Sequence, residues 1–379
     1  MIKIKKHLLA GLLGLALTLC SCSDSSSEIT NSSSVSTKAS TTTASTAASV
    51  SPSPETTTSA TEAQTTPSSA ETTTSAAETT TASSSSPDSS TPDSLPQGIP
   101  MWEGTAPNGN KITFLGTMHA AKADLYPIPE KVSVPFDQAE IVAFECDTET
   151  EKSEQYQFEL QRKALLNDGT TLADHLSPES YQILISHLTE LDVSGEQIDR
   201  YRPWAAYETL TSLWVSHSTT SYDNGIDYYL MRKTRSEGKT LHELESTQAQ
   251  LDVLSSQPDK AYDALIKLTK DQTRKAYNED NEKLYNSWLT GDIGQMESMS
   301  VLPSDDQFLA AGLTDEEISL VRSRNKMLVD DRNVTMANGI KELFKSGRKT
   351  MVCIGCAHFY GTNSIISLLE KEGYTFKRI

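Results

Sequence analysis

The segment MVCIGCAHFYG (351–361) decides which fold the sequence predicts. It begins as an unbroken apolar run and ends in small residues, a histidine and a final glycine. A nearly continuous apolar run of this length is typical of a strand buried on both faces, as in a parallel sheet that helices cover. Comparable runs occur upstream, so the segment is expected to be one strand of a larger sheet.

Four apolar runs predict strands, and helical patterns separate them. The strands are expected at 111–116 (KITFLG), 140–145 (EIVAFE), 239–245 (KTLHELE) and 350–355 (TMVCIG). Helical patterns of apolar residues cover 201–217, 260–289, 327–347 and 364–373. Strands interleaved with helices predict an α/β fold, with a central sheet, flanking helices and a large helical insertion between the second and fourth strands.

The first residues are interpreted as a secretory signal. Three lysines precede an apolar stretch, Leu8–Leu19, that is too short to cross a bilayer comfortably. The following Leu-Cys-Ser-Cys resembles a bacterial lipoprotein cleavage site with Cys22 as the acylated residue, and an ordinary signal with incidental cysteines is the alternative. Acyl chains on Cys22 would anchor the protein without a transmembrane helix. We therefore expect a signal peptide at 1–21 and an extracytoplasmic protein that is lipid-anchored to the cell membrane.

Composition divides the remaining chain into two parts. Residues 22–97 are mostly Ser, Thr, Ala and Pro, with too few large apolar side chains to form a core, which predicts a disordered tether. Residues 98–379 are expected to form the folded α/β part, as one large domain or two small ones.

The folded part is acidic. Subtracting the four basic and eight acidic residues of 1–97 from the totals of 33 and 51 leaves a net charge of −14 for residues 98–379. A nucleic-acid-binding protein usually has the opposite sign, so nucleic acid is excluded as the expected partner. The sequence does not indicate an oligomeric state.

Each predicted strand is followed by a polar side chain suited to metal binding or proton transfer. These side chains are His119, Glu145, Glu245 and His358. Ligands bind outside the carboxyl ends of the strands in open α/β sheets, so the four would converge if the strands are parallel neighbours. Nitrogen and oxygen ligands suit a divalent ion such as Mn, Co or Zn, with a further carboxylate as base. The alternative for each histidine alone is a hydrogen-bonded structural residue.

A Gly-x-x-His spacing occurs twice, at Gly116–His119 and Gly355–His358. Glycine permits a sharp turn, which would let each histidine point back over the end of its strand. Gly361 is expected to allow close packing of the helix that follows. The repetition of the spacing favours a shared site over two unrelated histidines.

Three cysteines, Cys146, Cys353 and Cys356, lie in the folded part. Three thiols are not a disulfide framework. Cys353 and Cys356 could form a redox pair, although a redox cysteine normally begins a helix and Cys353 falls inside a predicted strand. Cys146, Cys356 and His358 could instead hold a structural zinc. For Cys353 the favoured interpretation is a small buried core residue.

The order and spacing of these segments resemble the TraB/GumN/Tiki family over most of residues 100–379. The resemblance rests on FLGTMH, FE at 144–145, NGIDYYL (224–230), GKTLHELESTQAQLD (238–252), DDRNVTMANGI (330–340) and IGCAHFYGTNSIISLLEKEGY (354–374). Similarity to the Tiki branch implies a metal-dependent peptidase with two Gly-x-x-His motifs and a glutamate. By that resemblance His119, Glu145 and His358 are metal-site residues. Many relatives have alanine or glycine where this chain has Cys356-Ala357.

The resemblance also implies roles for Glu245, Arg332 and Asn333, which match further polar positions of the family pattern. Arg332 would hold a substrate carboxylate or developing negative charge, or alternatively form an ion pair with Asp330, Asp331 or Glu245.

The expected function is therefore a metal-dependent hydrolase, a peptidase, acting on a peptide or small-molecule substrate with Glu145, Glu245, Arg332 and Asn333 as catalytic residues. Other branches of the family are inhibitors of conjugation pheromones, so a non-catalytic protein that binds a peptide or small ligand is an alternative. A thiol protein using Cys353 and Cys356 is the third.

Overall fold

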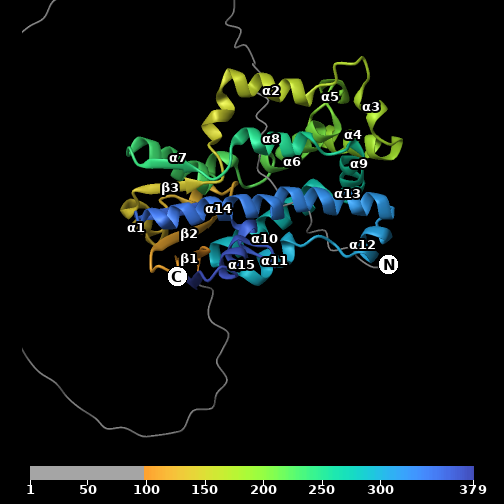
Figure 1. Cartoon of the computed structure of the whole chain (residues 1–379). Coiled ribbons are helices and arrows are strands. Elements are labelled where there is room, and N and C mark those ends of the chain that lie inside the picture. The colour runs from red at the N-terminus through yellow and green to blue at the C-terminus, as the bar shows by residue number, and fades with distance from the viewer. Residues whose placement is uncertain (1–97) are drawn as a thin grey trace, which may run out of the picture. The chain divides into compact units, whose positions relative to one another are not determined.

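The computed structural model describes residues 98–379, in which a six-stranded sheet is combined with many helices (Figure 1). The predictions for the signal peptide, Cys22 and the tether lie outside the described residues. The strands are β1 (Met101–Thr105), β2 (Lys111–Thr117), β3 (Ile141–Phe144), β4 (Thr240–Glu243), β5 (Thr350–Gly355) and β6 (Thr375–Arg378). The predicted α/β class is confirmed.

The sheet has the strand order β4-β3-β5-β2-β1-β6. The first four strands in this order are parallel, and they are the four that the sequence predicts. Strands β1 and β6 are antiparallel to their neighbours and were not predicted. Each is short and carries polar residues, so hydrophobic periodicity gives little signal for it.

The two faces of the sheet are covered by different helices. Val142 and Phe144 of β3 point into one core, and Ile141 and Ala143 point into the other, as the two-residue period of a strand requires. The first core is completed by α1 (Glu130–Gln138), α7 (Ile226–Ser236), α10 (Arg274–Thr290) and α11 (Ile293–Ser300). The second is completed by α14 (Asp331–Ser346) and α15 (Ile365–Glu370).

A third core belongs to a helical insertion between β3 and β5, where the sequence predicts one. In Figure 1 most of its helices extend to one side of the sheet. The helices that contribute most to this third core are α2 (Glu154–Ala164), α3 (Leu172–His175), α4 (Pro178–Glu190), α5 (Gly195–Ile198), α6 (Pro203–Ser216), α8 (Thr247–Ser255), α9 (Asp259–Leu268), α12 (Asp305–Ala310) and α13 (Asp315–Asn325).

The expectation of one continuous helix over 260–289 is wrong. The chain breaks between α9 and α10, and the Thr273 side chain accepts a hydrogen bond from the Ala276 backbone N–H to begin α10. Residues of α9 such as Tyr262 pack in the core of the insertion, whereas Trp288 of α10 packs against the sheet. Tyr277 near the start of α10 still packs in the core of the insertion, so α10 runs from that core to the sheet, whereas α9 packs within the insertion.

Short helical turns link these elements. They are η1 (Ala123–Leu125), η2 (Thr148–Lys152), η3 (Tyr222–Asn224) and η5 (Cys356–Phe359), together with a π-helical turn, η4 (Lys326–Asp330). The π-helical turn joins α13 to α14, so the pattern predicted at 327–347 begins as the continuation of an earlier helix. π-Helical turns are often found at functional sites, and this one leads directly into Arg332.

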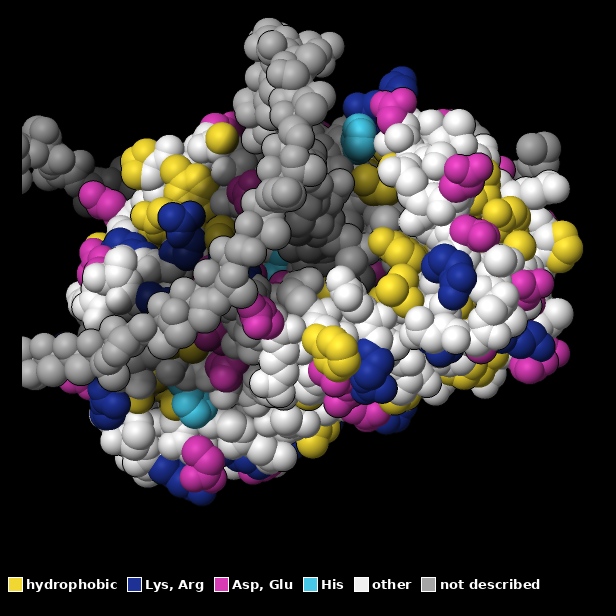
Figure 2. Space-filling model, turned by 90° about the horizontal axis from the view of Figure 1, so that it is seen from above, with side chains coloured by type: hydrophobic (Ala, Val, Ile, Leu, Met, Phe, Trp, Pro, Cys, Tyr) yellow, Lys and Arg dark blue, Asp and Glu magenta, His cyan; other side chains and the backbone are white. Residues whose placement is uncertain are grey.

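Two further features of the described part are its surface charge and the character of its helices. On the face shown in Figure 2, acidic side chains are interspersed with Lys and Arg side chains. Within residues 98–379, no helix combines the length and the apolar character needed to cross a membrane.

Candidate functional site

The carboxyl ends of three adjacent parallel strands bring the site together. Strand β5 lies between β3 and β2, with Cys353 beside Phe144 and Gly355 beside Thr117. Glu145 follows β3 directly, His119 lies two residues beyond β2, and His358 lies in the turn after β5. The condition for convergence of the strand ends, that the strands are parallel neighbours, is met.

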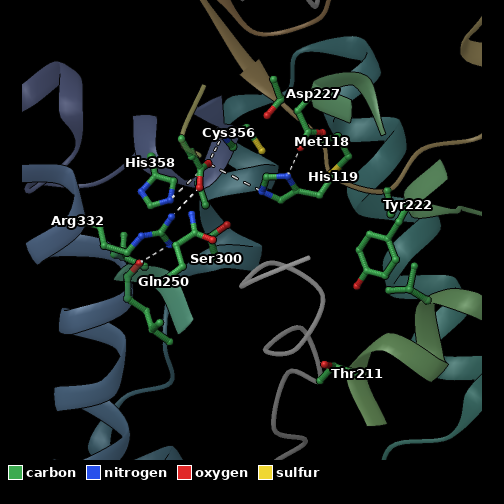
Figure 3. Close-up of a pocket in the computed structure, with 18 of the residues that line it drawn as sticks. Met118, His119, Thr211, Tyr222, Asp227, Gln250, Ser300, Arg332, Cys356 and His358 are labelled. Carbon is green, nitrogen blue, oxygen red and sulfur yellow. Dashed lines mark hydrogen bonds and ion pairs between the residues drawn. The ribbon is translucent and has the colours of Figure 1, made fainter. Parts of the chain in front are cut away.

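The two histidines flank one oxygen of Glu145. Figure 3 shows the rings of His119 and His358 facing one another across the site. His119 Nε2 lies 3.9 Å from Glu145 Oε1, and His358 Nε2 lies 3.8 Å from the same oxygen. All three side chains are at least two-thirds buried. A carboxylate oxygen between two imidazole nitrogens is therefore the centre of the site.

The other ring nitrogen of each histidine is held by an oxygen. His119 Nδ1 donates to Asp227 Oδ2 at 2.7 Å, and His358 Nδ1 donates to Asn333 Oδ1 at 2.6 Å. Asn333 Nδ2 in turn donates to the Asn363 carbonyl at 2.9 Å, which fixes its Oδ1 toward His358. Donation from Nδ1 leaves the lone pair of a neutral imidazole on Nε2, the atom that faces Glu145.

Asp227 was not singled out from the sequence. It lies in the first turn of α7, inside the NGIDYYL segment, 108 residues from the histidine that it contacts. A carboxylate in the first turn of a helix is common, because it complements the helix dipole. No local signal distinguishes Asp227 from such residues, and only the tertiary contact reveals it.

The different partners of the two histidines give them different protonation. Burial lowers the pKa of His119, but the carboxylates of Asp227 and Glu145 outweigh it and raise the pKa to about 9. Burial lowers the pKa of His358 to about 4, where Glu145 opposes the shift and Arg332 and His119 add to it. Without a metal, His119 is thus charged at neutral pH and His358 is neutral.

Glu145 is strongly held in its ionised form. Burial alone would raise its pKa, but His358, Arg332, His119 and the Gly355 backbone N–H outweigh burial and lower the pKa to about 2. Its Oε1 accepts from Gly355 N at 2.7 Å, and its Oε2 accepts from Arg332 Nη2 at 2.7 Å.

Arg332 links Glu145 to Glu245. Its Nε donates to the two oxygens of Glu245 at 2.8 and 3.1 Å, its Nη2 contacts both glutamates, and its Nη1 donates to the Leu328 carbonyl at 3.1 Å. Of the ion-pair partners considered from the sequence, Glu245 is the one that the structure pairs with Arg332. Asp331 pairs with Lys326 instead.

This arrangement changes the role expected for two of the predicted catalytic residues. The Glu245 side chain is 6% exposed, bonds to Arg332 and Gln250, and does not line the cavity beside the histidines. Asn333 is also outside the lining of that cavity. Each instead holds a residue that lines the cavity, Glu245 holding Arg332 and Asn333 holding His358.

The histidines and Glu145 open into a cavity that extends toward the helical insertion (Figure 3). Near the strand ends it is lined by polar side chains. Farther away its wall is largely apolar and aromatic and comes from α6, η3, α9, α10, α13 and η4, including Tyr207, Tyr222, Leu265, Tyr277, Val321 and Leu328. Most ligand-binding cavities combine an apolar wall with a few converging polar groups in this way.

Similarity to known proteins covers most of residues 98–379. The sequence model of the TraB/PrgY/gumN family matches residues 100–378. The chain belongs to this family. It is also similar to the uncharacterized protein YbaP of Escherichia coli (strain K12) and to that of Shigella flexneri, with 22% identity over 270 residues in each case, covering 70% of this chain and 90% of each relative. No solved structure matches the chain.

In this member of the TraB/PrgY/gumN family, three donor atoms face one another: His119 Nε2, His358 Nε2 and Glu145 Oε1. Two imidazole nitrogens and a carboxylate oxygen are ligands that Mn, Co and Zn accept. Ligands at about 2.0–2.1 Å in tetrahedral geometry lie about 3.3 Å from one another, so the observed separations of 3.8 and 3.9 Å are wider by about half an ångström.

Two further observations bear on the fit. Asp227 Oδ1 and Thr117 Oγ1 are buried, line the same cavity, and have no hydrogen-bond partner within the described part. As the side chains of residues 98–379 stand, no group of three or more His, Cys, Asp or Glu is arranged to hold a metal ion. The donors therefore fit in type, and coordination would need a small inward shift and the loss of the proton on His119.

Gly355 makes room at the centre of the site. A Cβ atom there would lie 2.9 Å from both Glu145 Oε1 and His119 Nε2. Its φ of −48° is open to other residues, so the expectation that glycine is required for a sharp turn is wrong at this position. The absent side chain, rather than backbone freedom, is what the site uses.

The other two motif glycines also differ from expectation. Gly116 lies within β2 rather than in a turn, and a Cβ there would approach Cys356 Cβ at 3.1 Å, so it serves close packing. Gly361 has a φ of +84° and open space around the position of a Cβ, so the packing role predicted for it is wrong. Its left-handed backbone is the feature that favours glycine.

The cysteines are not prepared for thiol chemistry. Cys353 is 1% exposed in β5, as predicted for a core residue, and burial raises its pKa. Burial raises the pKa of Cys356 to about 12 and that of Cys146 well above its usual value. The nucleophile in thiol chemistry is the thiolate, which none of the three forms readily at neutral pH.

Proposed function

We propose that this protein is an extracytoplasmic metal-dependent hydrolase that cleaves peptides and is held at the cell membrane by a lipid on Cys22. One observation carries the catalytic part: two histidine Nε2 atoms flank Glu145 Oε1 while each Nδ1 is held by an oxygen. Metal-binding histidines are typically oriented by such hydrogen bonds from their second nitrogen.

His119, Glu145 and His358 would hold the ion, with Mn, Co or Zn as candidates. When bound, a divalent ion polarises a carbonyl and allows water to act as a nucleophile at neutral pH. Asp227 and Asn333 are positioning residues, because they fix the ring orientation of His119 and His358. Loss of such partners typically weakens metal affinity or activity 10- to 100-fold.

Arg332 and Glu245 hold Glu145 in position, the first directly and the second through Arg332. Arg332 lines the cavity and donates to Glu145, so it holds that carboxylate in place. Glu245 orients Arg332 through its two oxygens.

A non-catalytic binding protein with the same cavity is the second candidate. It is favoured because both Glu145 oxygens already accept hydrogen bonds, one from Gly355 and one from Arg332, and these bonds compete with metal binding. In that case the cavity would sequester a peptide or other small ligand without turnover.

The test is cleavage of a quenched fluorescent peptide library by the purified full chain, stripped with chelator and then supplied with Mn, Co or Zn. We expect His358→Ala to lose both cleavage and bound metal, as measured by elemental analysis. His175→Ala is the matched control, because His175 pairs with Asp259 and does not line the cavity. Peptide binding without cleavage under all three metals would favour the second candidate.

A further inference from the structure

Three acidic side chains follow β3 in sequence, in and just before η2. Asp147 forms an ion pair with Arg235, and Glu149 pairs with Lys152 at 2.7 Å. The third, Glu151, lines the cavity together with His119, Glu145 and His358. Of the three, two are neutralised by a neighbour, and the one that reaches the cavity is not.

Glu151 lacks a partner of its own. Its carboxylate forms no hydrogen bond and no ion pair with any other residue of the described part, although the residue is half-buried. Burial raises its pKa to about 7; the charge of Lys152 opposes this shift, and Asp147 and Glu149 add to it. A carboxylate that is partly removed from water and unpaired is unfavourable, and a bound cation would relieve it.

The arginines that line the cavity are in the opposite situation. Arg324 donates to Glu208 at 2.9 Å, and Arg332 is bonded to Glu145 and Glu245. Their charges are already neutralised, so they offer little to a substrate carboxylate. Glu151, the unpaired group of this segment that lines the cavity, is acidic, which favours a ligand with a positive group.

We propose that Glu151 is the specificity-determining residue that binds an ammonium group of the substrate. The apolar and aromatic wall formed by the insertion would receive an apolar group of the same molecule. The inference rests on the proposed function, because it names the class of peptide that this cavity accepts. The ammonium can be a free amino terminus or a lysine side chain.

The test measures the binding of three labelled peptides to the full chain in the presence of chelator, so that turnover does not consume them. One is an apolar hexapeptide with a free amino terminus, the second is its N-acetylated form, and the third is an acetylated form with one lysine. We expect the first to bind roughly ten-fold more tightly than the second, as for a hydrogen bond to a charged group. Tight binding of the third peptide as well would identify lysine as a second source of the ammonium.

The variants separate Glu151 from general charge effects. Glu151→Gln should bind the free and acetylated peptides equally, and Glu151→Asp should keep part of the preference. Glu154→Gln is the matched control, because Glu154 is exposed at the start of α2 and its loss changes the net charge equally. It should keep the full preference.

The proposal is overturned if the wild-type protein binds the free and acetylated peptides equally or binds neither. It is also overturned if Glu151→Gln keeps the preference or Glu154→Gln loses it. The Glu151 proposal and the hydrolase proposal can fail separately. A preference for the ammonium group without any cleavage would refute hydrolysis but support the role of Glu151.

Discussion

Replacing Arg332 by methionine should destabilise the fold more than any surface change. Methionine keeps much of the length of the side chain and removes its charge. The Arg332 side chain is 7% exposed, and its partners Glu145 and Glu245 are 11% and 6% exposed. The change would leave two buried carboxylates without their cation.

Breaking a buried ion pair from one side typically costs about 3–5 kcal/mol, because the remaining charge is uncompensated. At about 2–4 °C for each kcal/mol in domains of 150–250 residues, the melting temperature should fall by roughly 6–20 °C. Thermal unfolding of the full chain in chelator, followed by circular dichroism, measures this shift without a contribution from bound metal.

Two further variants test the reasoning. Arg332→Met/Glu245→Gln should recover part of the loss, because only one buried carboxylate then lacks a partner. Lys326→Met is the matched control: it breaks the exposed pair with Asp331, and exposed pairs contribute under about 1 kcal/mol. A loss below about 1 kcal/mol for Arg332→Met, or no recovery in the double variant, would refute the assignment of Arg332 as the shared partner of two buried carboxylates.

Three other predictions follow from the site and the sequence. Gly355→Ala should lower the melting temperature and reduce metal content and peptide cleavage, because its Cβ would lie 2.9 Å from Glu145 and His119 and displace them; wild-type activity in this variant would contradict the packing argument. The pKa of Glu145 is depressed to about 2 from an ordinary 4.5, so its stabilisation is present above pH 4.5 and is lost as the pH falls toward 2. Urea unfolding in chelator should therefore show that wild-type protein loses more stability between pH 5 and pH 3 than Glu145→Gln, and equal losses would count against it. Cys22→Ala should release the protein from membranes or stall its processing, which detergent extraction measures, and unchanged retention would rule out lipidation.

The sequence identified the four parallel strands of the sheet well, for a clear physical reason. Strands buried on both faces must be apolar throughout, so β3 and β5 leave a continuous apolar signal. Strands β1 and β6 leave no comparable signal because they are short and partly polar. The break between α9 and α10 was missed because both halves are amphipathic, and periodicity does not say which core each half packs against.

The sequence by itself determined the fold class, the family and the positions of His119, Glu145 and His358, since each follows an apolar strand and strand ends in a parallel sheet share an edge. The tertiary structure alone decided what the surrounding residues do. It pairs Arg332 with Glu245 across 87 residues and His119 with Asp227 across 108. These partners meet because the chain packs into three cores that bring distant segments together, and no local sequence pattern predicts which segments meet.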